Sequence, residues 1–134
     1  MSEPTQPSEP RQVVSTGDAR LTTHVLDTAA GVPAAGVAIS VHRLLEGTDP
    51  VLVAEAMTNA DGRTDTPLLA GEQLSAGTYE IVFDVGAYFA AVGHDTTTPP
   101  FLDRVPVRFG TDGTRHLHVP LLVSPWSYST YRGS

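Results

Sequence analysis

Apolar and polar residues alternate in short runs along most of the chain. In the clearest run, residues 79–85, every second side chain is large and apolar. Alternation with a period of two predicts a strand that buries one face. The same pattern predicts further strands over residues 21–26, 37–42, 50–57, 64–69, 104–109, 116–121 and 126–131. One short helix is predicted over residues 86–93, where the alternation stops.

Clusters of Gly, Pro, Asp and Asn separate these runs. Two of them, residues 27–31 and 59–62, combine Asp or Asn with Gly, which is typical of tight turns. About eight short strands, about 8–12 residues apart and separated by turn residues, are the pattern of a β-sandwich. We therefore expect an all-β fold with one short helix.

The chain is predicted to consist of a tail and one domain. Residues 1–19 are rich in Pro, Ser and Glu, a composition that predicts a disordered tail. Residues 20–134 have the length of one domain, which can bury a sizeable hydrophobic core. The first residues lack the basic and apolar regions of a secretory signal, and no apolar run approaches the roughly 18 residues of a membrane span. We expect a cytoplasmic protein.

The absence of two residue types excludes several catalytic mechanisms. The chain has no Cys, and its 8 Lys and Arg residues are all Arg. These absences exclude a thiolate nucleophile, a zinc site built from Cys, and a lysine Schiff base. The 8 Arg stand against 15 Asp and Glu, and the resulting net charge of −7 disfavours nucleic acid and anionic membranes as partners.

Histidines in the predicted strands are the first candidates for chemistry. His116 and His118 alternate with apolar residues, so both are expected to point to the same face of their strand. Two imidazoles on one face can bind a metal or transfer a proton, but they can equally line the solvated face of an edge strand. The sequence shows no third metal ligand nearby, so we expect no metal site.

Two further polar residues lie at positions with an ordinary structural explanation. His24 lies in the run over residues 21–26, where a lone histidine is usually structural, and Arg63 follows a turn, where exposed charges are common. The chain has no Gly-x-Ser-x-Gly segment and no local pair of carboxylates of the glycosidase kind. Residue types and spacing alone therefore indicate a β-sandwich with a candidate His/Arg site.

Two longer segments carry a family resemblance. Residues 24–34, HVLDTAAGVPA, resemble the first signature of the transthyretin-like family, and residues 118–130, HVPLLVSPWSYST, resemble the second. Between them, residues 58–63 and 77–83 fit the family in the correct order. The resemblance runs from about residue 21 to the last residue. It implies a transthyretin-like β-sandwich of two four-stranded sheets with one short helix.

Four features resemble the 5-hydroxyisourate hydrolases of this family rather than its thyroid-hormone carriers. The chain ends in YRGS, residues 131–134, which the carriers lack, and it has His24 where they have a lysine. Arg63 and His118 also match the hydrolases. The resemblance implies hydrolysis of 5-hydroxyisourate to 2-oxo-4-hydroxy-4-carboxy-5-ureidoimidazoline, a step of urate degradation.

The resemblance also implies roles for individual residues. We expect His24 to act as the general base, His118 to orient it or relay the proton with His116 in support, and Arg63 to stabilise the oxyanion of the substrate. The sequence does not decide which histidine is the base and which is the acid. No cofactor and no metal ion are expected. The residues expected to bind the substrate are His24, Arg63, His116, Tyr131 and Ser134.

The assembly implied by the resemblance is a homotetramer, a dimer of dimers around a central channel. A neighbouring subunit would supply residues 131–134 to each site. The expected partner is a small molecule, 5-hydroxyisourate, with no nucleic acid and no membrane.

Two other functions stay open: a carrier that binds a hydrophobic ligand in the channel, and a non-catalytic β-sandwich module that binds peptide or carbohydrate. His24 and the terminal YRGS disfavour both.

Overall fold

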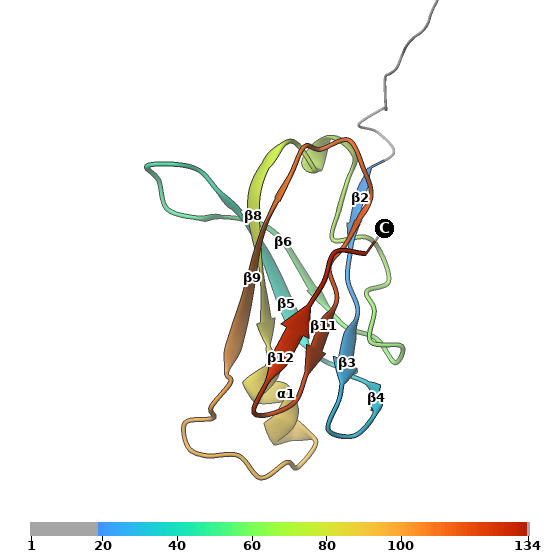
Figure 1. Cartoon of the computed structure of the whole chain (residues 1–134), viewed down its shortest axis with the longest axis vertical. Helices are drawn as coiled ribbons and strands as arrows, with labels where there is room; N and C mark the ends of the chain where they lie inside the picture. Colours follow the sequence, from blue (N-terminus) through green and yellow to red (C-terminus); the bar gives the residue numbers. More distant parts are fainter. Residues whose placement is uncertain (1–18, 134) are drawn as a thin grey trace, which may run out of the picture.

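Two layers of strands pack face to face in the structure, a computed structural model that describes residues 19–133 (Figure 1). The first layer is one antiparallel sheet with the strand order β6-β5-β8-β9. Its strands are β5 (Ala38–Leu44), β6 (Val51–Met57), β8 (Gly77–Asp84) and β9 (Arg104–Thr111).

The second layer is built from shorter strands. Within it, β2 lies between β10 and β7, while β3 lies between β11 and β4, and β12 pairs with the other side of β11. Strands β10 and β11 run parallel to β2 and β3. The first and last parts of the described chain are therefore neighbours in one layer. The strands are β2 (Arg20–Thr22), β3 (Val25–Asp27), β4 (Val32–Pro33), β7 (Leu69–Ala70), β10 (Leu117–His118), β11 (Leu121–Val123) and β12 (Tyr128–Thr130).

A break crosses the middle of the second layer. Thr23 and His24 separate β2 from β3, and Val119 and Pro120 separate β10 from β11. Pro120 has no N–H group to donate to a neighbouring strand. The buried Thr23 hydroxyl donates to the Val119 carbonyl at 2.6 Å, and the Leu121 N–H donates to the His24 carbonyl at 2.9 Å. These bonds hold the two strand paths together across the break.

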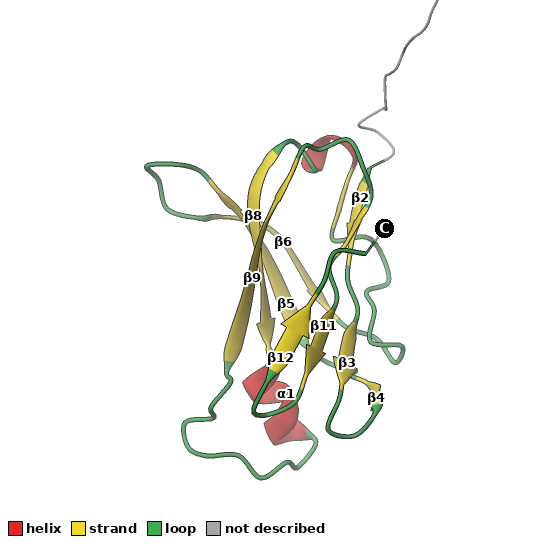
Figure 2. Cartoon of the chain, in the orientation of Figure 1, coloured by secondary structure: helices red, strands yellow, loops and turns green. Residues whose placement is uncertain are grey.

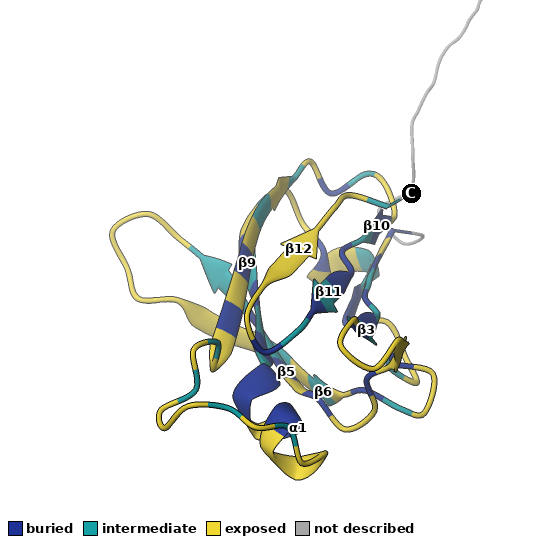
Figure 3. Cartoon of the chain, turned by 60° about the horizontal axis from the view of Figure 1, so that its bottom comes forward, coloured by how far each residue is buried: buried dark blue, intermediate teal, exposed yellow. Residues whose placement is uncertain are grey.

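The hydrophobic core fills the space between the layers. Along β8, Tyr79, Ile81 and Phe83 are all 0% exposed. From the second layer, Leu21 and Val25 are also buried in this core, and Figure 3 shows the alternation of buried and exposed residues along β9. Each such side chain contributes roughly 1.5–3 kcal/mol when fully buried, so the inner face of β8 is a main source of stability.

Helix α1 (Val85–Ala91) follows β8 directly and covers one end of the sandwich (Figure 2). The hydroxyl of its buried Tyr88 donates to the buried Asp27 carboxylate at 2.8 Å. The other oxygen of this carboxylate accepts the N–H groups of Ala29 and Ala30, both at 3.0 Å. Burial and the bond to Asp27 raise the pKa of Tyr88 to about 12. The phenol therefore stays a donor near neutral pH and ties the helix to the end of β3.

The predicted fold class is confirmed, and the predicted helix is α1. The prediction of a strand over residues 64–69 is wrong for most of its length, because in that range only Leu69 pairs with β2. Residues 64–67 form a tight loop instead, in which the Thr64 hydroxyl donates to the Thr66 carbonyl at 2.6 Å. Strand β4 is too short to show an alternating pattern.

The predicted tail over residues 1–19 lies almost wholly outside the described residues. Its last residue, Ala19, is 2% exposed, and its carbonyl accepts the Gly71 N–H at 2.8 Å. The domain boundary therefore stays a prediction. Among residues 19–133, the structure contains no helix of the length and apolar character needed to span a membrane.

Candidate active site

Two histidines meet at the break in the second layer. His24 lies between β2 and β3, and His118 is the last residue of β10. Nδ1 of His24 lies 2.7 Å from Nε2 of His118, and the ring centroids are 4.8 Å apart. A contact this short between two nitrogens is a hydrogen bond, so one imidazole donates and the other accepts.

The surroundings of the pair favour neutral imidazoles. Both side chains are half-buried. Burial lowers the pKa of His24 below its ordinary value of 6.5, and the nearby His118 and Arg63 lower it further. Burial, and then Arg63, also lower the pKa of His118. A neutral imidazole near pH 7 can accept a proton from water, and a bonded partner can relay it.

Arg63 lies opposite His24, with which it forms an isolated antiparallel bridge. Gly62 makes this approach possible: its φ is +74°, and a Cβ there would lie 2.5 Å from the Val25 carbonyl oxygen. The Gly62 carbonyl accepts the Val25 N–H at 2.8 Å, and the side-chain oxygen of Asn59 accepts the Arg63 N–H at 3.2 Å. The turn thus holds the backbone of Arg63 in place while its side chain remains exposed.

The C-terminal segment returns to the histidine pair. Gly133 forms a second bridge with His118: its N–H donates to the His118 carbonyl at 2.7 Å and its carbonyl accepts in return at 3.3 Å. A Cβ on Gly133 would lie 3.0 Å from the Cβ of His118. The chain's own Gly133 therefore lies against His118, and the expected contribution of residues 131–134 from a neighbouring subunit stays a prediction. Ser134, an expected substrate ligand, lies outside the described residues.

A small pocket opens beside the pair. Arg63 and Thr22 line it on the side of the pair, neither histidine lines it, and its size suits a small molecule. A larger depression, of about 330 Å³, lies on the outer face of the first layer around His42, Asp84 and Arg104, and shares no lining residue with this pocket. The pocket beside the pair has a volume of about 160 Å³ and is lined by Thr22, Thr23, Arg63, Thr64, Asp65, Thr66 and Pro67.

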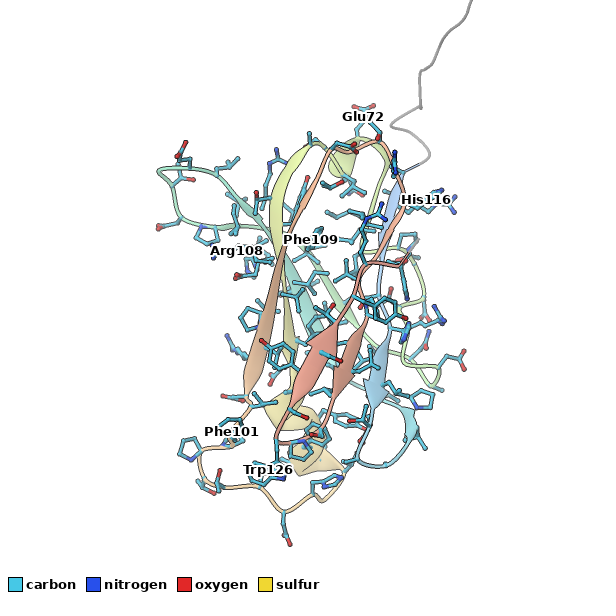
Figure 4. All side chains as sticks on the ribbon, viewed as in Figure 1. Glu72, Phe101, Arg108, Phe109, His116 and Trp126 are labelled. Carbon is cyan, nitrogen blue, oxygen red and sulfur yellow. The ribbon has the colours of Figure 1, made fainter. Side chains whose placement is uncertain are left out.

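Two expected substrate ligands lie apart from the pair. His116 is exposed and projects from the molecule (Figure 4). The expected placement of His116 and His118 along one strand is wrong, because a bend over residues 113–115 precedes β10 and the strand begins only at Leu117. Tyr131 is 54% exposed and lines a separate groove beside β9. Substrate binding by His116 and Tyr131 stays a prediction.

Thr22 is a site residue that the sequence reasoning missed. Its hydroxyl oxygen lies 2.9 Å from Nδ1 of His118, its partner in the parallel pairing of β2 with β10. The signal that could have found it is the period of two, because Thr22 lies two positions before His24 and therefore faces the same side. The structure thus joins Thr22, His118 and His24, with Arg63 opposite.

The fold and the site together define a two-layer β-sandwich with a histidine pair at the break in its second layer. Residues 21–133 match the HIUase/Transthyretin family, and the chain belongs to this family. A similar curated protein is the 5-hydroxyisourate hydrolase of Mesorhizobium japonicum, which is 55% identical over 115 residues that cover 86% of this chain and 92% of the relative.

Two solved structures are also similar. The structure of (S)-allantoin synthase has a TM-score of 0.82 and 51% identity; the match covers 90% of this chain but spans only 46% of that longer chain. Sea bream transthyretin in complex with thyroxine has a TM-score of 0.77 and 32% identity, with 86% of this chain and 95% of the transthyretin chain covered. The family fold therefore occurs both in an enzyme structure and in a thyroxine complex.

Proposed function

We propose that this protein hydrolyses 5-hydroxyisourate to 2-oxo-4-hydroxy-4-carboxy-5-ureidoimidazoline in urate degradation. The observation that carries the proposal is the 2.7 Å contact between His24 and His118, with Arg63 in a bridge opposite His24. The 55% identity to a 5-hydroxyisourate hydrolase supports the same activity. The pocket of about 160 Å³ that Arg63 and Thr22 line supports a small heterocyclic substrate.

The reaction adds water to a ring carbonyl and breaks the adjoining C–N bond. In the proposed mechanism, Nε2 of His24 removes a proton as the water oxygen bonds to the carbonyl carbon. The proton then passes from Nε2 of His24 to the departing ring nitrogen, so that the pair returns to its starting state. His118 orients His24 in this step, because its own Nε2 contacts His24 and its Nδ1 contacts Thr22. The lowered pKa values of both histidines support this role, because they keep the base unprotonated at neutral pH.

Arg63 is proposed to bind the carbonyl oxygen as it gains negative charge. Its guanidinium is permanently charged and offers N–H donors in a planar fork, which suits an oxyanion. One such donor typically contributes about 2.7–4 kcal/mol to transition-state stabilisation. The contact of Gly133 with His118 supports a role for the chain end, so Ser134 and Tyr131 remain proposed substrate ligands. His116 also remains a proposed substrate ligand.

A carrier of a hydrophobic ligand is the second candidate, because sea bream transthyretin, solved with thyroxine, is 32% identical to this chain. His24, which stands where the carriers have a lysine, and the terminal YRGS disfavour that function. A non-catalytic module that binds peptide or carbohydrate would leave the hydrogen bond between His24 and His118 without a role.

We also propose the homotetramer, a dimer of dimers. Strands β9 and β12 lie at sheet edges, where backbone groups can pair with another copy of the chain. Phe101 and Trp126 are 67% and 53% exposed at one end of the sandwich, with ring centroids 6.2 Å apart (Figure 4). Exposed aromatic side chains beside open edges favour self-association. Light scattering of the purified protein measures the mass of the assembly and so tests the tetramer. The cytoplasmic location stays a prediction.

The decisive experiment follows the ultraviolet decay of 5-hydroxyisourate produced in place by a urate oxidase. The wild-type protein should accelerate this decay, and His24→Ala should not. A matched control is His42→Ala, because His42 lies on the outer face of β5, among the residues of the separate depression. If the wild-type protein left the decay at the spontaneous rate, hydrolase activity would be excluded and the carrier function would be favoured.

A further inference from the structure

Thr22 contacts the histidine pair on the side of His118 that is turned away from His24. Its hydroxyl oxygen lies 2.9 Å from Nδ1 of His118, while Nε2 of the same ring contacts His24. The parallel pairing of β2 with β10 places Thr22 opposite His118, and the Thr22 carbonyl accepts the Val119 N–H at 2.9 Å. Since threonine is branched at Cβ, it has few rotamers, and the paired backbone therefore fixes the position of the hydroxyl.

Three side chains form one hydrogen-bonded line from Thr22 through His118 to His24. Each neutral imidazole carries one N–H. For Nε2 of His24 to accept a proton from water, the proton of His24 must sit on Nδ1, which then donates to Nε2 of His118. His118 must in turn carry its own proton on Nδ1. The group within hydrogen-bond distance of that proton is the Thr22 hydroxyl.

We propose that Thr22 is a positioning residue for the reaction: its hydroxyl accepts the Nδ1 proton of His118 and thereby keeps Nε2 of His24 free for the attacking water. This role rests on the proposed function of the pair. When His24 takes a proton, the positive charge is shared along the line, and Thr22 is its last acceptor.

Few charged groups face this line. Arg63 lies in the bridge opposite His24, and Asp65 lines the same pocket as Thr22. The Asp65 carboxylate accepts the side-chain N–H of Asn59 at 2.9 Å, and within the described chain it makes no hydrogen bond to either histidine. No carboxylate among the described residues therefore takes the place that Thr22 holds at Nδ1 of His118.

The test compares Thr22→Val, which removes the hydroxyl at nearly constant shape, with Thr22→Ser, which keeps it. Thr22→Val should lower kcat about 10- to 100-fold, because the protonated pair loses an acceptor, and should leave KM within about twofold. The acid limb of its pH profile should move to lower pH. Thr22→Ser should stay within about threefold of wild-type kcat, since its hydroxyl can make the same bond.

Thr130→Val is the matched control. The Thr130 hydroxyl donates to the Pro120 carbonyl at 2.7 Å, in the same layer but without contact to an imidazole. This variant should lose some thermal stability and keep the wild-type pH profile. An unchanged kcat in Thr22→Val, a serine variant as slow as the valine variant, or a raised KM at constant kcat would each overturn the proposal.

A second readout needs no substrate. In ¹⁵N NMR spectra of the wild-type protein, the His118 ring should carry its proton on Nδ1, and Thr22→Val should reduce this tautomer. A ring protonated on Nε2 in the wild-type protein would overturn the positioning role. If the wild-type protein does not hydrolyse 5-hydroxyisourate, the proposed function fails, whereas the tautomer of His118 still decides whether Thr22 positions the pair.

Discussion

Arg63 and His24 face each other across an isolated antiparallel bridge, so a permanent positive charge lies beside the proposed base. This charge lowers the pKa of both His24 and His118. In the proposed mechanism the same guanidinium also holds the oxyanion. Under this mechanism Arg63 would have two effects, one on the protonation of the pair and one on the transition state, and different substitutions separate them.

Arg63→Lys should keep the first effect and lose most of the second. Lysine retains the charge but lacks the planar fork of donors, so kcat/KM should fall by an amount equivalent to roughly 2–4 kcal/mol, with the acid limb of the pH profile little changed. Arg63→Gln should lose the donors and also move the acid limb to higher pH. Rate measurements across pH test both variants. Turnover near the wild-type rate in both would remove Arg63 from the catalytic set.

Replacing the proposed base should abolish activity without unfolding the protein. His24→Ala should lower kcat by about 10²–10⁴-fold, the usual contribution of a general base. The thermal midpoint should change little, because the side chain is half-buried and lies outside the hydrophobic core. Steady-state kinetics and a thermal melt measure the two quantities. A variant that folds and keeps the full rate would show that His24 is not the base.

The histidine pair should make stability depend on pH. Both pKa values are lowered in the folded protein, so below the ordinary value of 6.5 the unfolded chain binds protons more readily than the folded one. The contribution of the pair is therefore complete above about pH 6.5 and is lost as the pH falls through the lower values of the folded state. Urea unfolding at about pH 7.5 and about pH 5 measures the loss. A double variant, His24→Gln with His118→Gln, should reduce the difference; an equal difference in both proteins would assign it to other groups.

The contact between Gly133 and His118 should be needed for activity. In Gly133→Ala the new methyl group would lie 3.0 Å from the Cβ of His118, tighter than ordinary packing, and should displace the imidazole. Activity should fall, and deletion of residues 131–134 should lower it further, while the thermal midpoint stays nearly constant. Gly110→Ala is a suitable control, because the nearest atom to its new methyl group would be 3.9 Å away. Full activity in the deletion variant would place the chain end outside the site.

Activity should require no metal ion. Among residues 19–133, no three His, Cys, Asp or Glu side chains lie close enough together to hold a metal ion. Zinc bound to His24 and His118 would compete with their proton transfer, so added zinc should inhibit and a chelator should not. Assays with a chelator and with zinc test this directly. Activity that a chelator removes and zinc restores would overturn the mechanism.

The strands of the first layer could be predicted from the sequence because their alternation is long. Strand β8 runs for 8 residues with one fully buried face, and its predicted and observed limits nearly coincide. The loop over residues 64–67 could not be predicted in the same way, since side-chain bonds such as that of Thr64, rather than alternation, determine its shape.

The site was less accessible to prediction. His24 and His118 are 94 residues apart in sequence, so only the family resemblance brought them together. His116 was misplaced because a bend before Leu117 interrupts the expected strand. The sequence does not predict the proposed role of Thr22, because that role depends on the parallel pairing of β2 with β10. A local sequence pattern does not predict which distant strands pair.

The wide separation of the paired histidines also has a kinetic consequence. Hairpins such as β5–β6 join residues close in sequence and can form early, whereas the parallel pairing of β2 and β3 with β10 and β11 must close a loop of most of the domain. The reactive geometry exists only after that closure. During refolding, recovery of catalysis should therefore lag behind recovery of β-structure, and the enzyme's own reaction would report the completion of its topology.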